Sequence, residues 1–208
     1  RTASKDVFAG DPYPYESPDT THFSVMDRYG NAVSNTYTLN FSYGSGIMIP
    51  GTGMLMNNEM DDFSSKPGVP NGYGLLGSEA NSIEANKRPL SSMTPTIIFK
   101  EDKPYLVLGS PGGSRIITTV LQVALNVMEH GMNVAQAVNS PRIHHQWLPE
   151  TLMIEKGFGP DTEKLLQEKG YRLYPSSTMG SVQAILKDGE YFYGAADPRR
   201  PGSGAVAP

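Results

Sequence analysis

Thr20 stands where a turn-rich segment meets a strand-like one, and it could do chemistry of one particular kind. The segment before it, Asp11–Pro18, is rich in proline, and His22–Met26 has the composition of a strand. A threonine hydroxyl is a weak nucleophile unless a base lies beside it. Cleavage of the Asp19–Thr20 bond would place such a base, the new α-amino group, on Thr20 itself. Without that cleavage, Thr20 is an ordinary residue at the start of a strand.

A glycine-rich segment, Gly109–Arg115, lies between a predicted strand and the clearest predicted helix. Adjacent Gly112 and Gly113 let the backbone turn freely and leave the amides uncovered by side chains. Amides near a helix N-terminus carry partial positive charge, so the loop suits a phosphate or the oxyanion that forms in acyl transfer. The absence of a Gly-Lys-Ser/Thr ending disfavours a P-loop. A strand-to-helix connection that merely needs glycine is the alternative.

Two further polar segments could bind the charged ends of a small substrate. Ser91 and Ser92 can donate to one carboxylate if the backbone is kinked, and otherwise they are turn or capping residues. Asn57–Asp62 supplies acceptors for an ammonium group but lacks the spacing of an EF-hand calcium loop, so a solvated turn is its alternative. His144 and His145 are adjacent rather than at helical spacing, and we expect no metal site there.

The elements that must position these residues include both strands and helices. The stretch 41–93 is rich in Gly, Asn, Ser and Pro and weakly periodic, and a stretch of that kind is usually functional. Strands at both ends with helices between them predict an α+β fold, with helices packed on sheets. The expected strands are His22–Asp27, Asn31–Leu39, Thr96–Lys100, Tyr105–Leu108, Ser181–Lys187 and Tyr191–Gly194, and the expected helices are Ser114–His130, Val134–Asn139 and Pro160–Lys169.

The composition indicates one sizeable globular domain, or one subunit of something larger. The chain has 208 residues, 38% hydrophobic and 18% charged, with a formal net charge of −4. With no basic stripe, we do not expect a nucleic-acid partner. Cysteine is absent, which excludes disulfides and a cysteine nucleophile. The chain begins at Arg1 with no secretory signal, so we expect a processed or excised piece of a longer product.

Six segments, in this order along the chain, resemble the small subunit of γ-glutamyltranspeptidase. The likeness runs from about Tyr15 through Arg199. It implies an N-terminal nucleophile hydrolase with a four-layer αββα sandwich, of which this chain is the small-subunit part. It also implies two regions: 1–19, the end of the large subunit upstream of the autoprocessing site, and 20–208, the small-subunit catalytic region. The six segments are Thr20–His22, Thr36–Asn40, Leu55–Phe63, Arg88–Met93, Gly109–Arg115 and Pro141–Pro149.

The resemblance also implies roles for individual residues. Thr20 matches the threonine that cleaves the precursor and then acts as the catalytic nucleophile, and Thr38 matches the threonine that supports it. Gly112 and Gly113 match the amides of the oxyanion hole. The implied substrate-binding residues are Asn40, Glu59 and Asp62 for the α-amino end of the γ-glutamyl group, Ser91 and Ser92 for its α-carboxylate, and Tyr73 for a lid over the pocket.

The implied reaction passes a γ-glutamyl group from glutathione or a related donor to water, an amino acid or a dipeptide. No metal or organic cofactor is implied. The implied partner is a large subunit from the same precursor, which supplies an arginine for the α-carboxylate. Because residues 1–19 block the amine of Thr20 and that subunit is missing, we expect the 208-residue chain alone to be inactive. The implied location is periplasmic or extracellular.

Two alternatives stay open at this point. Cephalosporin acylases of the same fold hydrolyse a glutaryl amide, whose glutaryl group lacks an α-amino group, so the presence of Asn40, Glu59 and Asp62 favours γ-glutamyl substrates. An inactive homologue could instead serve as a binding subunit. The competent residue at every matched catalytic position argues against that second alternative.

Overall fold

The computed structural model describes residues 20–147 and 149–207, and the predicted leader, residues 1–19, lies outside them. Strands β1, Thr21–Met26, and β2, Ala32–Tyr37, pair as an antiparallel hairpin, and they confirm the first two predicted strands with small shifts at their ends. The Asp27 carboxylate closes the turn, because its Oδ1 accepts hydrogen bonds from the amides of Tyr29 and Asn31, each at 2.9 Å.

The two faces of this hairpin differ in chemistry. Its inner face is polar: the Ser24 hydroxyl donates to the Gln183 carbonyl at 3.0 Å, and the Ser34 hydroxyl donates to the Leu108 carbonyl at 2.9 Å. His22 also lies on this face, buried beneath Gly109, where any side chain would collide with its ring. The outer face carries large apolar side chains that are exposed, namely Phe23, Val25, Val33 and Tyr37.

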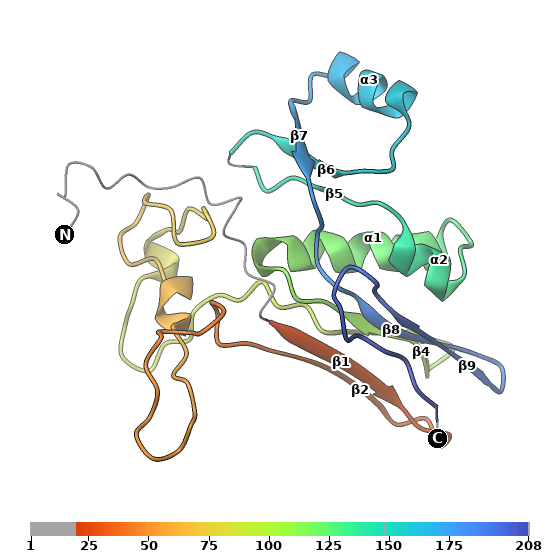
Figure 1. Cartoon of the computed structure of the whole chain (residues 1–208), viewed down its shortest axis with the longest axis horizontal. Helices are drawn as coiled ribbons and strands as arrows, with labels where there is room; N and C mark the ends of the chain where they lie inside the picture. The colour runs from red at the N-terminus through yellow and green to blue at the C-terminus, as the bar shows by residue number, and fades with distance from the viewer. Residues whose placement is uncertain (1–19, 148, 208) are drawn as a thin grey trace.

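A four-stranded antiparallel sheet in the order β3-β4-β8-β9 lies against the inner face of the hairpin (Figure 1). Both residues of its first turn, Glu101 and Asp102, have positive φ, as a tight two-residue hairpin requires. The predicted strands are therefore confirmed, with small shifts at their ends. Their bounds are Thr96–Lys100 for β3, Lys103–Gly109 for β4, Gln183–Asp188 for β8 and Tyr191–Ala196 for β9.

Helices α1, Ile116–Met128, and α2, Val134–Asn139, cover the other face of this sheet (Figure 1). The predicted long helix is shorter than expected, because Gly113–Arg115 forms a separate 3-10 turn, η5, before it. The main core lies between these helices and the sheet. Hairpin, sheet and helices thus form three stacked layers, and the α+β prediction is confirmed. The core residues include Leu106, Leu108, Ile116, Val120, Val123, Val138, Val182 and Ala184.

A third sheet was not predicted. It joins β5, Ile143–His144, to β6, Leu152–Glu155, and β6 to β7, Leu173–Ser176. The pairing of β6 with β7 is parallel, and helix α3, Pro160–Glu168, makes the crossover between them. The long stretch 41–93 has few regular elements among the described residues, apart from the 3-10 helices η3, Glu59–Asp62, and η4, Glu79–Asn81.

Among the described residues, no helix has the length and apolar character needed to cross a membrane.

Candidate active site

The two threonines singled out from the sequence meet at the open end of the hairpin. Thr21 pairs with Tyr37, so the same register places Thr20 opposite Thr38. The Thr20 hydroxyl donates a hydrogen bond to the Thr38 hydroxyl at 3.1 Å, and Thr38 Oγ1 also accepts from the Asn40 amide at 2.9 Å. Thr20 is buried, with 5% of its surface exposed. The hairpin register therefore fixes the position of the candidate nucleophile, Thr20, relative to its hydroxyl partner, Thr38.

Arg200 holds the backbone of the candidate nucleophile. Its Nη1 donates a hydrogen bond to the Thr20 carbonyl oxygen at 2.7 Å. No local signal in the sequence identifies this contact, since the two residues are 180 positions apart. A charged donor on that carbonyl restricts the peptide that carries Thr20, and it therefore helps to fix the direction of the hydroxyl.

Glu59 and Asp62 form a carboxylate pair on the 3-10 helix η3. A 3-10 helix has three residues per turn, so side chains three apart lie on one side of it. Burial, with the negative charge of Asp62 as a second cause, raises the pKa of Glu59 to about 7. Burial also raises the pKa of Asp62. Glu59 Oε1 is a buried oxygen without a hydrogen-bond partner among the described residues. A buried cation at this pair would relieve both the repulsion and the missing bond.

Asn40 shapes the loop beside this pair. Its φ is 73°, a left-handed conformation that asparagine tolerates better than most residues. The Asn40 side-chain Nδ2 donates to the Asn58 carbonyl at 3.1 Å, and Asn58 Oδ1 accepts from the Phe41 backbone amide at 3.1 Å. These bonds hold the end of β2 against the start of η3, so that Asn40 lies near Glu59 in the wall of one cavity.

Tyr73 packs over the glycine loop and connects it to Asn40. Its hydroxyl donates to the Asn40 carbonyl at 2.8 Å, and its ring packs edge-on against Phe41 at 5.5 Å. A Cβ at Gly113 would lie 2.8 Å from this ring, and the φ of Gly113 is +55°. Both facts disfavour other residues at position 113, because a side chain there would be strained and would press against the Tyr73 ring.

The second glycine of the loop has a different position. Gly112, with a φ of +137°, packs against the backbone of Gly180, where an added Cβ would lie 3.3 Å from the Gly180 Cα. Gly113 lines the cavity that Thr20 also lines, whereas Gly112 is not among its lining residues. The Ser110 hydroxyl, which accepts from the Ser181 amide at 2.8 Å, joins the loop to the same backing segment.

A chain of polar contacts anchors the C-terminal end of the glycine loop. The Ser114 hydroxyl donates to Gln146 Oε1 at 2.8 Å, and His144 Nε2 lies 2.9 Å from the same oxygen. His144 Nδ1 lies 2.7 Å from the Thr118 hydroxyl. His144 is therefore a buried residue between helix and loop, while His145 is exposed and packs edge-on against Tyr171.

One cavity collects nearly all of the predicted site residues. Only about 30 Å³ of it is open to the centres of water-sized spheres, while the empty space between its walls, counted with its opening, is about 360 Å³. The cavity is lined by Thr20, Thr38, Asn40, Glu59, Asp62, Tyr73, Ser91, Ser92 and Gly113, together with Leu75, Met93, Ser114 and Ile116.

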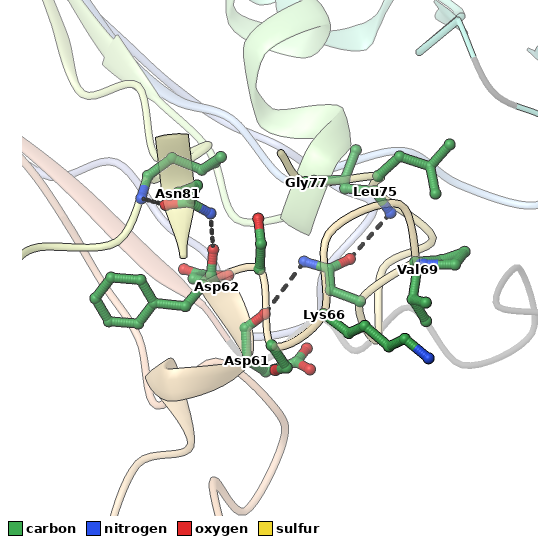
Figure 2. A pocket seen from close by; sticks show the side chains of 14 residues that line it. Asp61, Asp62, Lys66, Val69, Leu75, Gly77 and Asn81 are labelled. Carbon is green, nitrogen blue, oxygen red and sulfur yellow. Dashed lines mark hydrogen bonds between the residues drawn. The ribbon is translucent and has the colours of Figure 1, made fainter. Parts of the chain in front are cut away.

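A second cavity shares Asp62 and Leu75 with the first (Figure 2). The side chain of Asn71 spans it. Its Nδ2 donates to the Asp61 carbonyl at 3.4 Å, and its Oδ1 accepts from the Leu75 backbone amide at 3.0 Å. The loop that carries Tyr73 is therefore joined to η3 by side-chain hydrogen bonds rather than by a sheet.

This geometry agrees with comparisons to known proteins. The gamma-glutamyltranspeptidase family model matches residues 2–207, nearly the whole chain. The chain belongs to the gamma-glutamyltranspeptidase family. A glutathione hydrolase proenzyme of Escherichia coli is 59% identical over 198 residues, which cover 94% of this chain and 34% of that relative. The chain thus spans about a third of the length of the curated relatives that it matches.

Solved structures of this family confirm the fold of an N-terminal nucleophile hydrolase. A mutant of Helicobacter pylori gamma-glutamyltranspeptidase superposes with a TM-score of 0.84 at 59% identity, and the match covers 86% of this chain and 100% of the solved chain. A cephalosporin acylase from Bacillus halodurans is more distant, with 25% identity and a TM-score of 0.73; the match covers 94% of this chain and 35% of the acylase chain. Full coverage of the solved gamma-glutamyltranspeptidase chain, against a third of the proenzymes, agrees with a processed two-chain enzyme.

Proposed function

We propose that this chain is the catalytic segment of an enzyme that hydrolyses and transfers γ-glutamyl groups. One observation carries the proposal: a nucleophilic hydroxyl, a carboxylate pair with an unpartnered buried oxygen, and two serines line a single cavity. The nucleophile and the two binding groups match an amide whose far end carries both an ammonium and a carboxylate. A γ-glutamyl amide has this arrangement.

Activation begins with cleavage of the bond before Thr20. In this proposal Thr20 Oγ attacks the Asp19 carbonyl carbon, the C–N bond breaks, and the amide nitrogen becomes the free α-amine of Thr20. Water then hydrolyses the ester that is left. The Thr38 hydroxyl and Arg200, which contact the Thr20 side chain and carbonyl, hold the residue in the orientation for this step.

Turnover uses the same hydroxyl, now with its base on the same residue. Glu59, Asp62 and Asn40 hold the donor ammonium, and Ser91 and Ser92 donate to its carboxylate. Thr20 Oγ attacks the γ-carbonyl carbon while the Thr20 amine accepts the hydroxyl proton.

The glycine loop stabilises the negative charge that forms on the carbonyl oxygen, with Gly113 in the cavity wall and Gly112 behind it. The proton on the Thr20 amine passes to the leaving amine, which is Cys-Gly when glutathione is the donor. Water, an amino acid or a dipeptide then attacks the γ-glutamyl ester and regenerates Thr20. These steps need no cofactor.

The partner in this proposal is the large subunit from the same precursor. The exposed apolar face of the hairpin, with Phe23, Val25 and Val33, supports this proposal, since in an αββα sandwich a fourth layer covers that face. We also propose that this subunit supplies an arginine for the donor carboxylate, and that the enzyme is periplasmic or extracellular.

A pair of donors tests the function against the acylase alternative. The full protein, with the upstream segment, should release p-nitroaniline from L-γ-glutamyl-p-nitroanilide with a kcat/KM at least about tenfold above that for glutaryl-p-nitroanilide. The reason is that the glutaryl donor leaves the buried carboxylate pair without its ammonium, and hydrogen bonds to charged groups contribute about 1.5–3 kcal/mol. Preference for the glutaryl donor would establish an acylase, and turnover of neither donor by cleaved protein would indicate a binding subunit.

The raised pKa of Glu59 predicts how binding depends on pH. An ammonium binds best to the ionised carboxylate, which predominates above pH 7 and is lost as the pH falls below it. The Kd of L-glutamate should therefore rise below pH 7, by at most about tenfold per pH unit for one protonation. Calorimetric titration of L-glutamate from pH 5.5 to 8 measures this. In Glu59→Gln the inflection near pH 7 should disappear, and its persistence there would show that another group controls binding.

A further inference from the structure

The two ends of the candidate substrate site lie on separate segments. The carboxylate pair is on η3, and the serine pair, Ser91 and Ser92, is on a loop well downstream of it. In the proposed function, one carbon of the donor carries both the ammonium and the carboxylate. The distance between the two segments must then be held to a fraction of an ångström, yet neither segment belongs to a sheet.

Asn81 connects these two segments through its side chain. Its Nδ2 donates to the Asp62 carbonyl at 2.7 Å, and its Oδ1 accepts from the Leu90 amide at 3.0 Å. Figure 2 shows the Asn81 amide next to Asp62, with the first of these bonds as a dashed line. Asp62 is itself a member of the carboxylate pair, and Leu90 immediately precedes Ser91. The side-chain hydrogen bonds of Asn81 thus reach both segments.

The backbone of Asn81 is held as firmly as its side chain. Its carbonyl accepts from the Ser64 amide at 2.9 Å, and its own amide donates to the Ser78 carbonyl at 3.0 Å. Asn81 is also half-buried, so water competes less for its amide. A planar side-chain amide has its donor and its acceptor at a fixed separation, and Asn81 is anchored at four points.

We propose that Asn81 is a positioning residue that sets the separation between the ammonium-binding and the carboxylate-binding segments. This inference rests on the proposed function and adds to it a determinant of donor specificity. Asn81 touches no substrate. It acts through Asp62 and Leu90, and its effect should appear only with donors that engage both segments at once.

Three donors distinguish positioning from a general loss of structure. L-γ-glutamyl-p-nitroanilide engages both segments, glutaryl-p-nitroanilide lacks the ammonium, and 4-aminobutanoyl-p-nitroanilide lacks the carboxylate. In the full, cleaved protein, Asn81→Ala should raise KM for the first donor roughly 10- to 100-fold, as expected for two lost hydrogen bonds, with kcat changed only a few-fold. The kcat/KM for each of the other two donors should change by less than about threefold, because one point of contact does not depend on the separation.

Two further variants serve as a control and as a second test of the role of Asn81. Ser82→Ala removes a neighbouring hydroxyl that bonds only to the Glu79 carbonyl, and it should leave all three donors unchanged. Asn81→Asp keeps the acceptor for the Leu90 amide but replaces the donor to the Asp62 carbonyl with a second acceptor, so its KM for the first donor should rise at least as much as that of Asn81→Ala. If Asn81→Ala does not accumulate as cleaved protein, Asn81→Asp alone provides the comparison.

Two results would overturn the inference. An equal loss of kcat/KM on all three donors would mean that Asn81 only supports the fold, and an unchanged KM for the γ-glutamyl donor would mean that it does not set the separation. Either result with normal wild-type turnover of that donor refutes the role of Asn81 alone. Failure of the wild-type protein to turn over the donor refutes the proposed function itself, and the inference with it.

Discussion

Replacing Thr20 by alanine is expected to abolish both cleavage of the precursor and turnover of γ-glutamyl donors. The same hydroxyl attacks in both reactions, and in the structure it is the buried group that bonds to Thr38. Loss of a catalytic nucleophile costs on the order of 10⁶-fold in kcat in a serine protease. A drop of similar size is expected here, together with a single uncleaved band on a denaturing gel.

Two neighbouring variants separate chemistry from structure. Thr20→Ser keeps an Oγ and should still cleave itself and turn over the donor, at a reduced rate. Thr21→Ala changes the adjacent threonine of β1, which pairs with Tyr37 of β2 and does not line the cavity that Thr20 lines. It should leave activity within a few-fold of wild type. Full activity of Thr20→Ala would refute the assigned nucleophile.

Replacing Asp197 by alanine is expected to cause the largest loss of stability. Asp197 has no exposed surface and accepts hydrogen bonds from Arg142 Nη2 at 2.6 Å, from Arg199 Nη1 at 3.1 Å and from the Val182 amide at 2.9 Å. Glu155 neutralises only one of the two guanidinium groups. Removing one partner of a buried ion pair leaves an uncompensated charge, which typically costs about 3–5 kcal/mol.

The ion pairs of Asp197 also support the segment that lies behind the glycine loop of the candidate site. Arg142 Nη1 also donates to the Met179 carbonyl at 2.6 Å, next to Gly180, which backs the glycine loop. Urea unfolding of the cleaved protein should show the loss. Asp188→Ala, at the exposed end of β8, is the matched control and should stay within about 0.5 kcal/mol of wild type. A loss below about 1 kcal/mol in Asp197→Ala would show that the ion cluster is not a stabilising element.

The sequence predicts those parts of the site that are formed by residues close together along the chain. Strand-forming composition on either side of Arg28–Gly30 predicts β1 and β2, and the register of their hairpin brings Thr20 to Thr38. The glycine loop before a helix is equally local. The ordered motifs add the carboxylate and serine residues, which the structure places in the same cavity although they come from a stretch with little regular structure.

Other parts depend on contacts that no local pattern records. The contact of Arg200 with the Thr20 carbonyl joins residues 180 positions apart. The sheet of β5, β6 and β7 was missed because its strands have two to four residues and lack alternation: all four residues of β6 are buried, including the charged Glu155. Glu155 can lie there because Arg199 folds back onto it, with Nη2 2.7 Å from its Oε2, and because the backbone amides of Arg142 and Met179 donate to its carboxylate at 3.0 and 2.6 Å. Asn81, in a polar loop, shows its role only once both of its partners are placed.

The most direct test of the central claim is the N-terminus of the catalytic chain in fully active protein. Intact mass measurement and N-terminal sequencing, made on protein expressed with its upstream segment, should find a chain that begins at Thr20. Its mass should increase by one γ-glutamyl group when the reaction is quenched during turnover, with the added group on Thr20. Full activity with the Asp19–Thr20 bond intact would contradict the account, because Thr20 would then lack the amine that the proposed chemistry requires.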